Sequence, residues 1–359
     1  MSLLVTIVAF LIAIGVLVTI HELGHYWAAR WCDVKILRFS LGFGRPLILR
    51  RRGPDQTEWV LAALPLGGYV KMADERDESV APEERARAFN NKTVWQRIFI
   101  VAAGPAANFL LAIAILTGFV AIYGQSVAPP VVQAVVEGSA AEKMGLKPGD
   151  RIQSIAGVSI DSFQDLAAEV SIHGGDTVPI TYVRNGVSLS KDITVGIIEE
   201  KDRFGNRYKR GMLGLPFPPL EVREVSLFEA PFIAVRETAN IVRLTVKTLG
   251  QIITGRRPIS ELGGPLKIAK VSGEQFVLGF AAFLWLTAMI SINLGFINLL
   301  PIPMLDGGHL LLYGIEAVRR RPATPMVQEW AFRAGFAVLL GFMLMVTFND
   351  LASFGLFGE

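Results

Sequence analysis

The chain has 359 residues, of which 52% are hydrophobic and 19% are charged. This composition excludes a disordered chain and is unusually apolar for a soluble enzyme, so part of the chain is expected in lipid. The net charge of only +3 argues against a nucleic-acid partner. The single cysteine, Cys32, excludes a disulfide framework and leaves metal binding to His, Asp and Glu.

Four apolar runs are long enough to cross a bilayer, at residues 3–20, 99–123, 276–300 and 331–348. The first run lacks the basic start and the small-residue cleavage site of a signal peptide. We therefore expect an α-helical polytopic membrane protein with four transmembrane helices. Residues 1–123 and 276–359 would form its two membrane regions.

Basic residues in the short connections predict the orientation. They are frequent between the first and second spans and again at residues 319–321, so these two connections are expected in the cytosol. The long segment between the second and third spans would then be extracytoplasmic.

That segment carries the pattern of a small β-rich domain. Residues 178–184 and 187–195 are β-prone runs joined at Asn185-Gly186, which predicts a hairpin. Ser139 has the capping-box spacing of a short helix that Gly145 can end. We expect one domain over residues 124–200, followed by a connector over residues 201–275 with an amphipathic helix at 235–253.

Residues 21–25 read HELGH, which places two imidazoles four residues apart on one helical face with a glutamate beside them. His21 and His25 could bind one zinc ion, and Glu22 could act as the base. A pair of interfacial histidines without a metal is the structural alternative. Polar residues next to an apolar helix are costly unless they face the interior and have a function, which favours the zinc site.

A catalytic zinc usually has three protein ligands, so one is still to be found. The third span would end at the same membrane face as the first, and a turn with two prolines and two glycines follows it. Asp306 in this turn is the best-placed carboxylate, with His309 as a competing ligand. The alternative is a polar interfacial turn.

At this point the chain resembles the site-2 intramembrane zinc metalloproteases, and within them the bacterial regulator of sigma-E protease group. The resemblance is carried by residues 21–25, 39–44, 65–72, 104–108, 263–265 and 298–307. It implies that His21, His25 and Asp306 bind Zn²⁺ and that Glu22 is the catalytic carboxylate. It also implies a bacterial inner-membrane protein with a periplasmic PDZ domain and an active site near the cytosolic side.

The resemblance names the substrates as well. It suggests single-pass membrane proteins such as trimmed anti-sigma factors in a stress response, and signal-peptide remnants, with peptide C-termini bound at the PDZ domain. In this chain the segment has room for one PDZ domain, whereas longer relatives carry two in tandem. A size-gating role of the pair is therefore in doubt.

A substrate helix in lipid must exchange its own hydrogen bonds for others before it can be cut. Residues 50–72 are predicted to form a cytosolic-side β-hairpin that pairs with the substrate through Tyr69, Val70 and Lys71, and the family has a re-entrant β-loop there. A purely structural hairpin is the alternative. Asn298 is predicted to contact substrate, whereas Asn108 and Asn293 are predicted to tie helices together.

The leading hypothesis is an intramembrane zinc endopeptidase. The alternative is a non-proteolytic membrane-anchored PDZ scaffold with a structural metal site. Glu22 discriminates between them, because a scaffold needs no carboxylate beside two metal ligands. A metal transporter fits poorly, because one three-ligand cluster provides no relay of sites across a bilayer.

Overall fold

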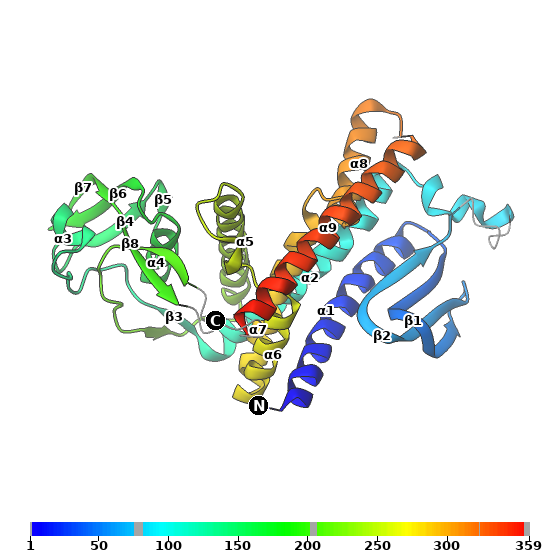
Figure 1. Ribbon diagram of the computed structural model, residues 1–359, viewed down its shortest axis with the longest axis horizontal. Helices are drawn as coiled ribbons and strands as arrows, with labels where there is room; N and C mark the ends of the chain where they lie inside the picture. The colour runs from blue at the N-terminus through cyan, green and yellow to red at the C-terminus, as the bar shows by residue number, and fades with distance from the viewer. Residues whose placement is uncertain (1, 75–81, 202–206, 323, 355–359) are drawn as a thin grey trace. The chain divides into compact units, whose positions relative to one another are not determined.

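The computed structural model describes residues 2–74, 82–201, 207–322 and 324–354. It divides into two compact units (Figure 1). Unit 1 comprises Met1–Leu116 and Gly263–Asp350, and unit 2 comprises Thr117–Leu262 and Leu351–Glu359.

Among the described residues, four helices are long and apolar enough to cross a membrane. These are α1 (Leu3–Trp31), α2 (Val94–Tyr123), α7 (Phe280–Leu299) and α9 (Pro325–Ser353). The prediction of four such helices is confirmed, although their bounds differ from the apolar runs. α1 continues beyond Ile20 and carries the HELGH sequence inside the helix. The third begins at Phe280 because Gly279, with a φ of 122°, separates it from α6 (Pro265–Leu278).

A long β-hairpin lies alongside α1 in unit 1 (Figure 1). It is formed by β1 (Ile36–Arg52) and β2 (Thr57–Met72), so it begins well before the expected residue 50. Its register makes residues 38–41 central, because they pair with 68–71 on one side and with 58–61 on the other. The segment 68–72 is therefore an edge of this sheet.

The Gly263-Gly264-Pro265 stretch lies at the start of α6, and the end of α9 contacts it there. The Asp350 carboxylate accepts backbone hydrogen bonds from Gly264 at 2.9 Å, Leu266 at 3.1 Å and Lys267 at 3.0 Å. A Cβ atom on Gly264 would lie 2.6 Å from Asp350 Oδ2, so only glycine permits this approach. Asp350 thus satisfies the free N–H groups that begin a helix.

Unit 2 contains a four-stranded antiparallel sheet with the order β5-β4-β6-β7. The strands are β4 (Arg151–Ile155), β5 (Val158–Ser159), β6 (Thr177–Arg184) and β7 (Val187–Thr194). The predicted hairpin at Asn185-Gly186 is confirmed, and both residues have positive φ, as a tight hairpin turn requires. The predicted short helix is also confirmed as α3 (Ala140–Met144), with Ser139 and Gly145 as its caps.

The core of unit 2 lies between this sheet and α4 (Phe163–Ile172). Two further strand pairs flank it: β3 (Gln125–Val127) with β10 (Glu221–Arg223), and β8 (Gly196–Lys201) with β9 (Arg207–Met212). Leu213 belongs to the same core, so this unit continues beyond residue 200.

The predicted amphipathic helix is confirmed as α5 (Ala230–Ile253), which packs on α4. Short 3₁₀ helices occur at η1 (Pro82–Arg87), η2 (Phe89–Asn91) and η3 (Ile259–Glu261). Between α7 and α9 lies α8 (Asp306–Arg319), which begins at the carboxylate singled out in the sequence.

Candidate metal centre

Three side chains that are distant in sequence meet in unit 1. His21 Nε2 lies 3.2 Å from His25 Nε2 and 3.1 Å from Asp306 Oδ2. His25 Nε2 lies 3.5 Å from Asp306 Oδ1. Among the described residues these three form the one cluster of His, Cys, Asp or Glu side chains that could hold a metal ion. His309, the competing ligand, is not part of the cluster.

The separations between these donor atoms match those of a zinc site. Bonds of roughly 2.0–2.1 Å in a tetrahedron place neighbouring ligand atoms about 3.3 Å apart. The observed separations run from 3.1 to 3.5 Å. Two imidazole nitrogens and one carboxylate oxygen are also a ligand set typical of a catalytic zinc, with a fourth position left for water.

The protonation of His25 is fixed by a neighbouring helix. Its Nδ1 lies 2.9 Å from the carbonyl oxygen of Ile100 on α2, and a carbonyl can only accept. The proton of a neutral imidazole therefore resides on Nδ1, which leaves the Nε2 lone pair free for a metal.

Asn108 plays the corresponding part for His21, a role that the sequence did not predict. We predicted that Asn108 would tie helices together. Its backbone carbonyl does accept a hydrogen bond from Ser291 on α7, but its side-chain amide lies 3.2 Å from His21 Nδ1. Its Oδ1 is buried and has no partner among the described residues. Turning the amide over would let Oδ1 accept from His21 Nδ1–H, which leaves the Nε2 lone pair of His21 free for a metal.

Gly104 leaves the space beside the two metal-facing nitrogens. A Cβ atom at this position would lie 2.3 Å from His25 Nε2 and 2.9 Å from His21 Nε2. Any side chain here would collide with the imidazoles or occupy the place of the ion. The glycine in the stretch 104–108 thus has a physical reason, which the sequence alone did not reveal.

Asp306 reaches the histidines because the chain folds back tightly after α7. A Cβ on Gly307 would lie 2.2 Å from the Leu300 carbonyl oxygen, and one on Gly308 would lie 2.4 Å from that of Ile302. Met304 has a φ of 85°, a conformation that costs energy in a residue other than glycine. The two glycines therefore permit the turn that places Asp306 at the start of α8.

Glu22 lies between the histidines on α1 and faces the hairpin edge. Like His21 and His25, it is only 9% exposed. The backbone N–H of Val70 donates a hydrogen bond to its carboxylate. A Cβ on Gly68 would lie 3.1 Å from Glu22 Cγ, so the edge segment passes directly beside this side chain.

The other predicted site residues are not members of the metal-binding cluster. Tyr69 and Lys71 flank Val70 on the same edge segment, and the Tyr69 hydroxyl accepts a 3.4 Å hydrogen bond from Arg38. Asn298 is half-buried near the end of α7, before the turn that carries Asp306. Asn293 is exposed on α7, which does not match the helix-packing role predicted for it.

A family comparison agrees with this geometry. The model of peptidase family M50 matches residues 9–342, which include all three members of the cluster and Glu22. The chain belongs to peptidase family M50. Together with the names of its relatives, this makes it a zinc-dependent metalloprotease.

Its curated relatives cover nearly the whole chain. It is 40% identical to "Putative zinc metalloprotease Atu1380" of Agrobacterium fabrum, over 97% of this chain and 96% of the relative. It is 37% identical to metalloprotease MmpA of Caulobacter vibrioides, over 99% and 97%, and 34% identical to protease RseP of Yersinia pestis, over 98% and 99%. The alignment with RseP spans 454 positions, so that relative has inserted segments that this chain lacks.

Similarity to solved structures was found for a part of the chain. One of these structures is the PDZ domain of an SdrC-like protein from Listeria monocytogenes, which covers 24% of this chain and 84% of its own, at 26% identity and a TM-score of 0.20.

Proposed function

We propose that this member of family M50 is a site-2-type intramembrane endopeptidase that cuts single-pass membrane proteins within or near their spans. The observation that carries this proposal is the convergence of His21, His25 and Asp306 at tetrahedral spacing beside Glu22, with the two histidines on a helix of membrane-spanning character and Asp306 at the start of α8. The three residues are assigned as zinc ligands and Glu22 as the catalytic carboxylate.

When bound, zinc would polarise the scissile carbonyl and lower the pKa of a water molecule toward about 7. Glu22 would take a proton from this water and deliver it to the leaving amine. The Val70 N–H orients the carboxylate for this transfer. The Ile100 carbonyl and Asn108 keep the two imidazoles in the form that leaves Nε2 free.

Cleavage in lipid also requires hydrogen-bond partners for the substrate backbone, and the edge segment 68–72 can supply them. A transmembrane substrate must unwind, and each backbone group it frees needs a new partner. An extended substrate can add as a strand to this edge, beside Tyr69 and Lys71, where Glu22 is already hydrogen-bonded. Asn298, near the end of α7, is also assigned to substrate binding.

The charge pattern and the relatives support the wider setting of the proposal. Basic connections support a location of the hairpin and the metal centre near the cytosolic face of a bacterial inner membrane, with the hairpin re-entering the lipid. Exposed apolar residues on the hairpin, including Phe43, Leu47 and Leu64, suit contact with lipid. Unit 2 would then be periplasmic, and the substrates would resemble trimmed anti-sigma factors.

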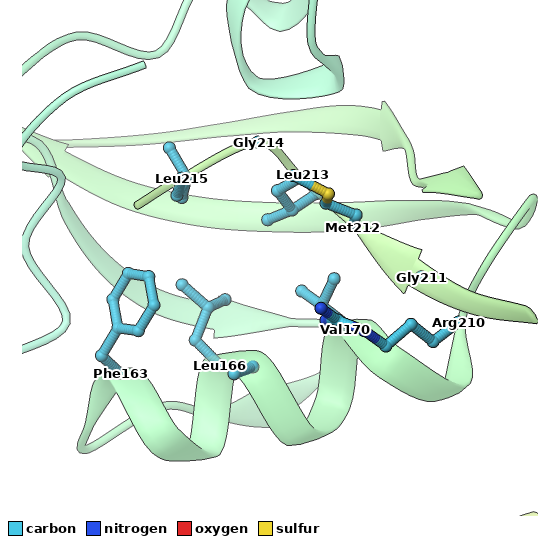
Figure 2. Close-up of a pocket in the computed structure, with 10 residues that line it drawn as sticks. Phe163, Leu166, Val170, Arg210, Gly211, Met212, Leu213, Gly214 and Leu215 are labelled. Atoms are coloured by element: carbon cyan, nitrogen blue, oxygen red, sulfur yellow. The ribbon is translucent and has the colours of Figure 1, made fainter. Parts of the chain in front are cut away.

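Within unit 2, the proposed peptide site is the groove between α4 and the end of β9. Phe163, Leu166 and Val170 on α4 face residues 211–215, where β9 ends and the chain continues, as Figure 2 shows. Their pocket has a volume of about 70 Å³, too small for an added strand, which would need about 4.8 Å from its neighbour. A PDZ-type domain that binds peptide C-termini here would therefore have to widen this groove.

The test compares the purified protein with its Glu22→Gln variant on a single-span substrate, with bound zinc measured in the same samples. We expect both to hold one zinc ion, and cleavage by the variant to fall at least about 1,000-fold, since proton transfer and orientation by the carboxylate are both lost. Glu329→Gln, an exposed carboxylate on α9, is the matched control and should cleave normally. Equal cleavage by the variant and the parent would refute the role of Glu22.

A further inference from the structure

A cleft separates α1 from the β-hairpin in unit 1, with a volume of about 620 Å³. One wall is α1, from Leu11 through Gly15 to Thr19, and the other is the hairpin, at Leu41, Gly42 and Gly67. Its volume lies in the range of pockets that hold small-molecule ligands or several side chains.

The surface of this cleft is apolar. Apart from Thr19, all the residues that line it are aliphatic or glycine. The Thr19 hydroxyl donates a 2.6 Å hydrogen bond to the Gly15 carbonyl, so it offers no free donor. A polar or charged guest would lose its hydration here without compensation, whereas an apolar guest would gain from burial.

Gly15 is what keeps the helix side of the cleft open. A Cβ atom at this position would have no heavy atom within 4 Å, so the space in front of it is empty. A larger side chain would project into the cleft without disturbing the packing of α1. The width of the cleft at this level is thus determined by one position.

The cleft is continuous with the catalytic residues. Val18, which lines it, and Glu22 both lie next to Gly68: a Cβ there would be 2.9 Å from Val18 Cγ1 and 3.1 Å from Glu22 Cγ. Thr19 and Ile20 line the cleft and directly precede His21. A substrate chain that continues from the edge segment past Glu22 would therefore enter the cleft.

We infer that this cleft is a binding site for apolar side chains of the substrate, on the part of its membrane segment that lies deeper in the bilayer than the scissile bond, and that Gly15 sets the size it accepts. The inference rests on the proposed function for the identity of the occupant. Continuity with Glu22 and the edge segment favours substrate over a lipid chain, which would have no need to reach the catalytic carboxylate.

The geometry also predicts the register. Gly15 precedes Glu22 by seven residues, or about 10 Å along the helix. An extended substrate rises about 3.3 Å per residue, so the side chain at Gly15 would be about three residues from the scissile bond. A substrate that stayed helical, at about 1.5 Å per residue, would place it about seven residues away.

The first experiment measures binding without cleavage. In a Glu22→Gln, Cys32→Ser background, Gly15→Cys is oxidatively cross-linked to substrates with single cysteines scanned along the span. We expect one maximum about three residues from the bond that the active enzyme cuts. Gly341→Cys is the matched control, since Gly341 lies on the spanning helix α9 and also has open space in front of it. Its cross-linking should be weak and without a maximum.

A flat profile at Gly15→Cys, or one equal to that of Gly341→Cys, would overturn the inference and would be the result if lipid filled the cleft. A maximum about seven residues away would overturn the extended register. If the active enzyme cut no substrate but the cross-link still had one maximum, the proposed function would fail and the binding site would stand. If the active enzyme cut the substrate but the cross-link had no maximum, the proposed function would stand and the binding site would fail.

The second experiment measures selection by size. Substrates with Phe or Ala at the cross-linked position are compared in the active enzyme and in its Gly15→Leu variant. The ratio of kcat/KM for Phe over Ala should fall about tenfold or more in the variant, as expected when a pocket loses room for an apolar group. Gly341→Leu should leave the ratio unchanged, and bound zinc is measured in all proteins. An unchanged ratio in Gly15→Leu would overturn the role of Gly15.

Discussion

At the scale of single residues, the metal centre depends as much on a missing side chain as on the ligands. His21 and His25 supply the nitrogens, but Gly104 on α2 lies against both, and the Ile100 carbonyl and Asn108 fix the ring protons. These α2 positions contact the imidazoles rather than the ion. Changes in such surrounding groups typically alter metal affinity by about 10- to 100-fold.

Gly104→Ala should therefore reduce zinc affinity at least about tenfold, because its methyl group must displace His25 Nε2. The measurement is zinc retention against a competing chelator. Gly118→Ala on the same helix is the control, since a Cβ there meets nothing within 4 Å. Equal retention by both variants would show that the imidazoles can move aside without losing the ion.

At the scale of elements, α4 has two different faces. One lines the groove with Phe163, Leu166 and Val170, and the other is held to α5 by a buried carboxylate, Glu169. Glu169 accepts a 2.5 Å hydrogen bond from Arg243 and another from Lys247, and His173 Nε2 lies 3.4 Å away. A buried carboxylate with these partners is stabilising only while it is charged.

This contact gives the α4–α5 pair a dependence on pH. Burial raises the pKa of Glu169, but the hydrogen bonds from Lys247 and Arg243 lower it by more, so the pKa lies below its ordinary value. A carboxylate with a lowered pKa in the folded state stabilises it above the unfolded pKa, near 4.3, and this stability is lost as the pH falls through the folded value. Protection of α4 from hydrogen exchange, corrected for intrinsic rates, should thus decline below about pH 4.

Glu169→Gln should remove most of this pH dependence and lower the protection at neutral pH. Glu199→Gln is the control, because Glu199 forms an exposed pair with Lys209 that contributes little. The assignment would be wrong if the Glu199→Gln and Glu169→Gln proteins had the same pH profile.

At the scale of the whole molecule, the metal centre joins segments that are far apart in the chain. His21 and His25 lie on the first helix, whereas Asp306 follows the third long apolar helix. A ligand that binds only the folded arrangement stabilises it, by about 2.7 kcal/mol at a concentration 100 times its dissociation constant. Zinc should therefore contribute to the stability of unit 1 as well as to catalysis.

Removal of zinc by a chelator should lower the midpoint of thermal unfolding by about 5 °C or more, and added zinc should restore it. Tryptophan fluorescence would measure the unfolding of unit 1, because all six tryptophans lie in that unit, at positions 27, 31, 59, 95, 285 and 330. Asp306→Asn should show no such shift, whereas Glu329→Gln should keep it. A shift of equal size in Asp306→Asn would place the responsible ion elsewhere.

The sequence by itself determined the local features of this protein. Apolar length predicted four helices of membrane-spanning character, Asn185-Gly186 predicted its hairpin, and the spacing of His21 and His25 predicted two nitrogens on one helical face. These features follow from residue propensities and from helical or strand periodicity, which act over a few residues. The beginning of β1 at Ile36 was missed, because glycines interrupt the strand pattern there.

Only the tertiary structure decided which distant groups meet. It brought Asp306 within 3.5 Å of both histidines and placed the Val70 amide beside Glu22. It gave Asn108, which was predicted to tie helices together, a side-chain contact with His21. It also revealed the cleft in front of Gly15. Such contacts depend on how closely backbones approach one another, and the absence of a side chain at Gly68, Gly104 or Gly307 has no meaning until its neighbour is known.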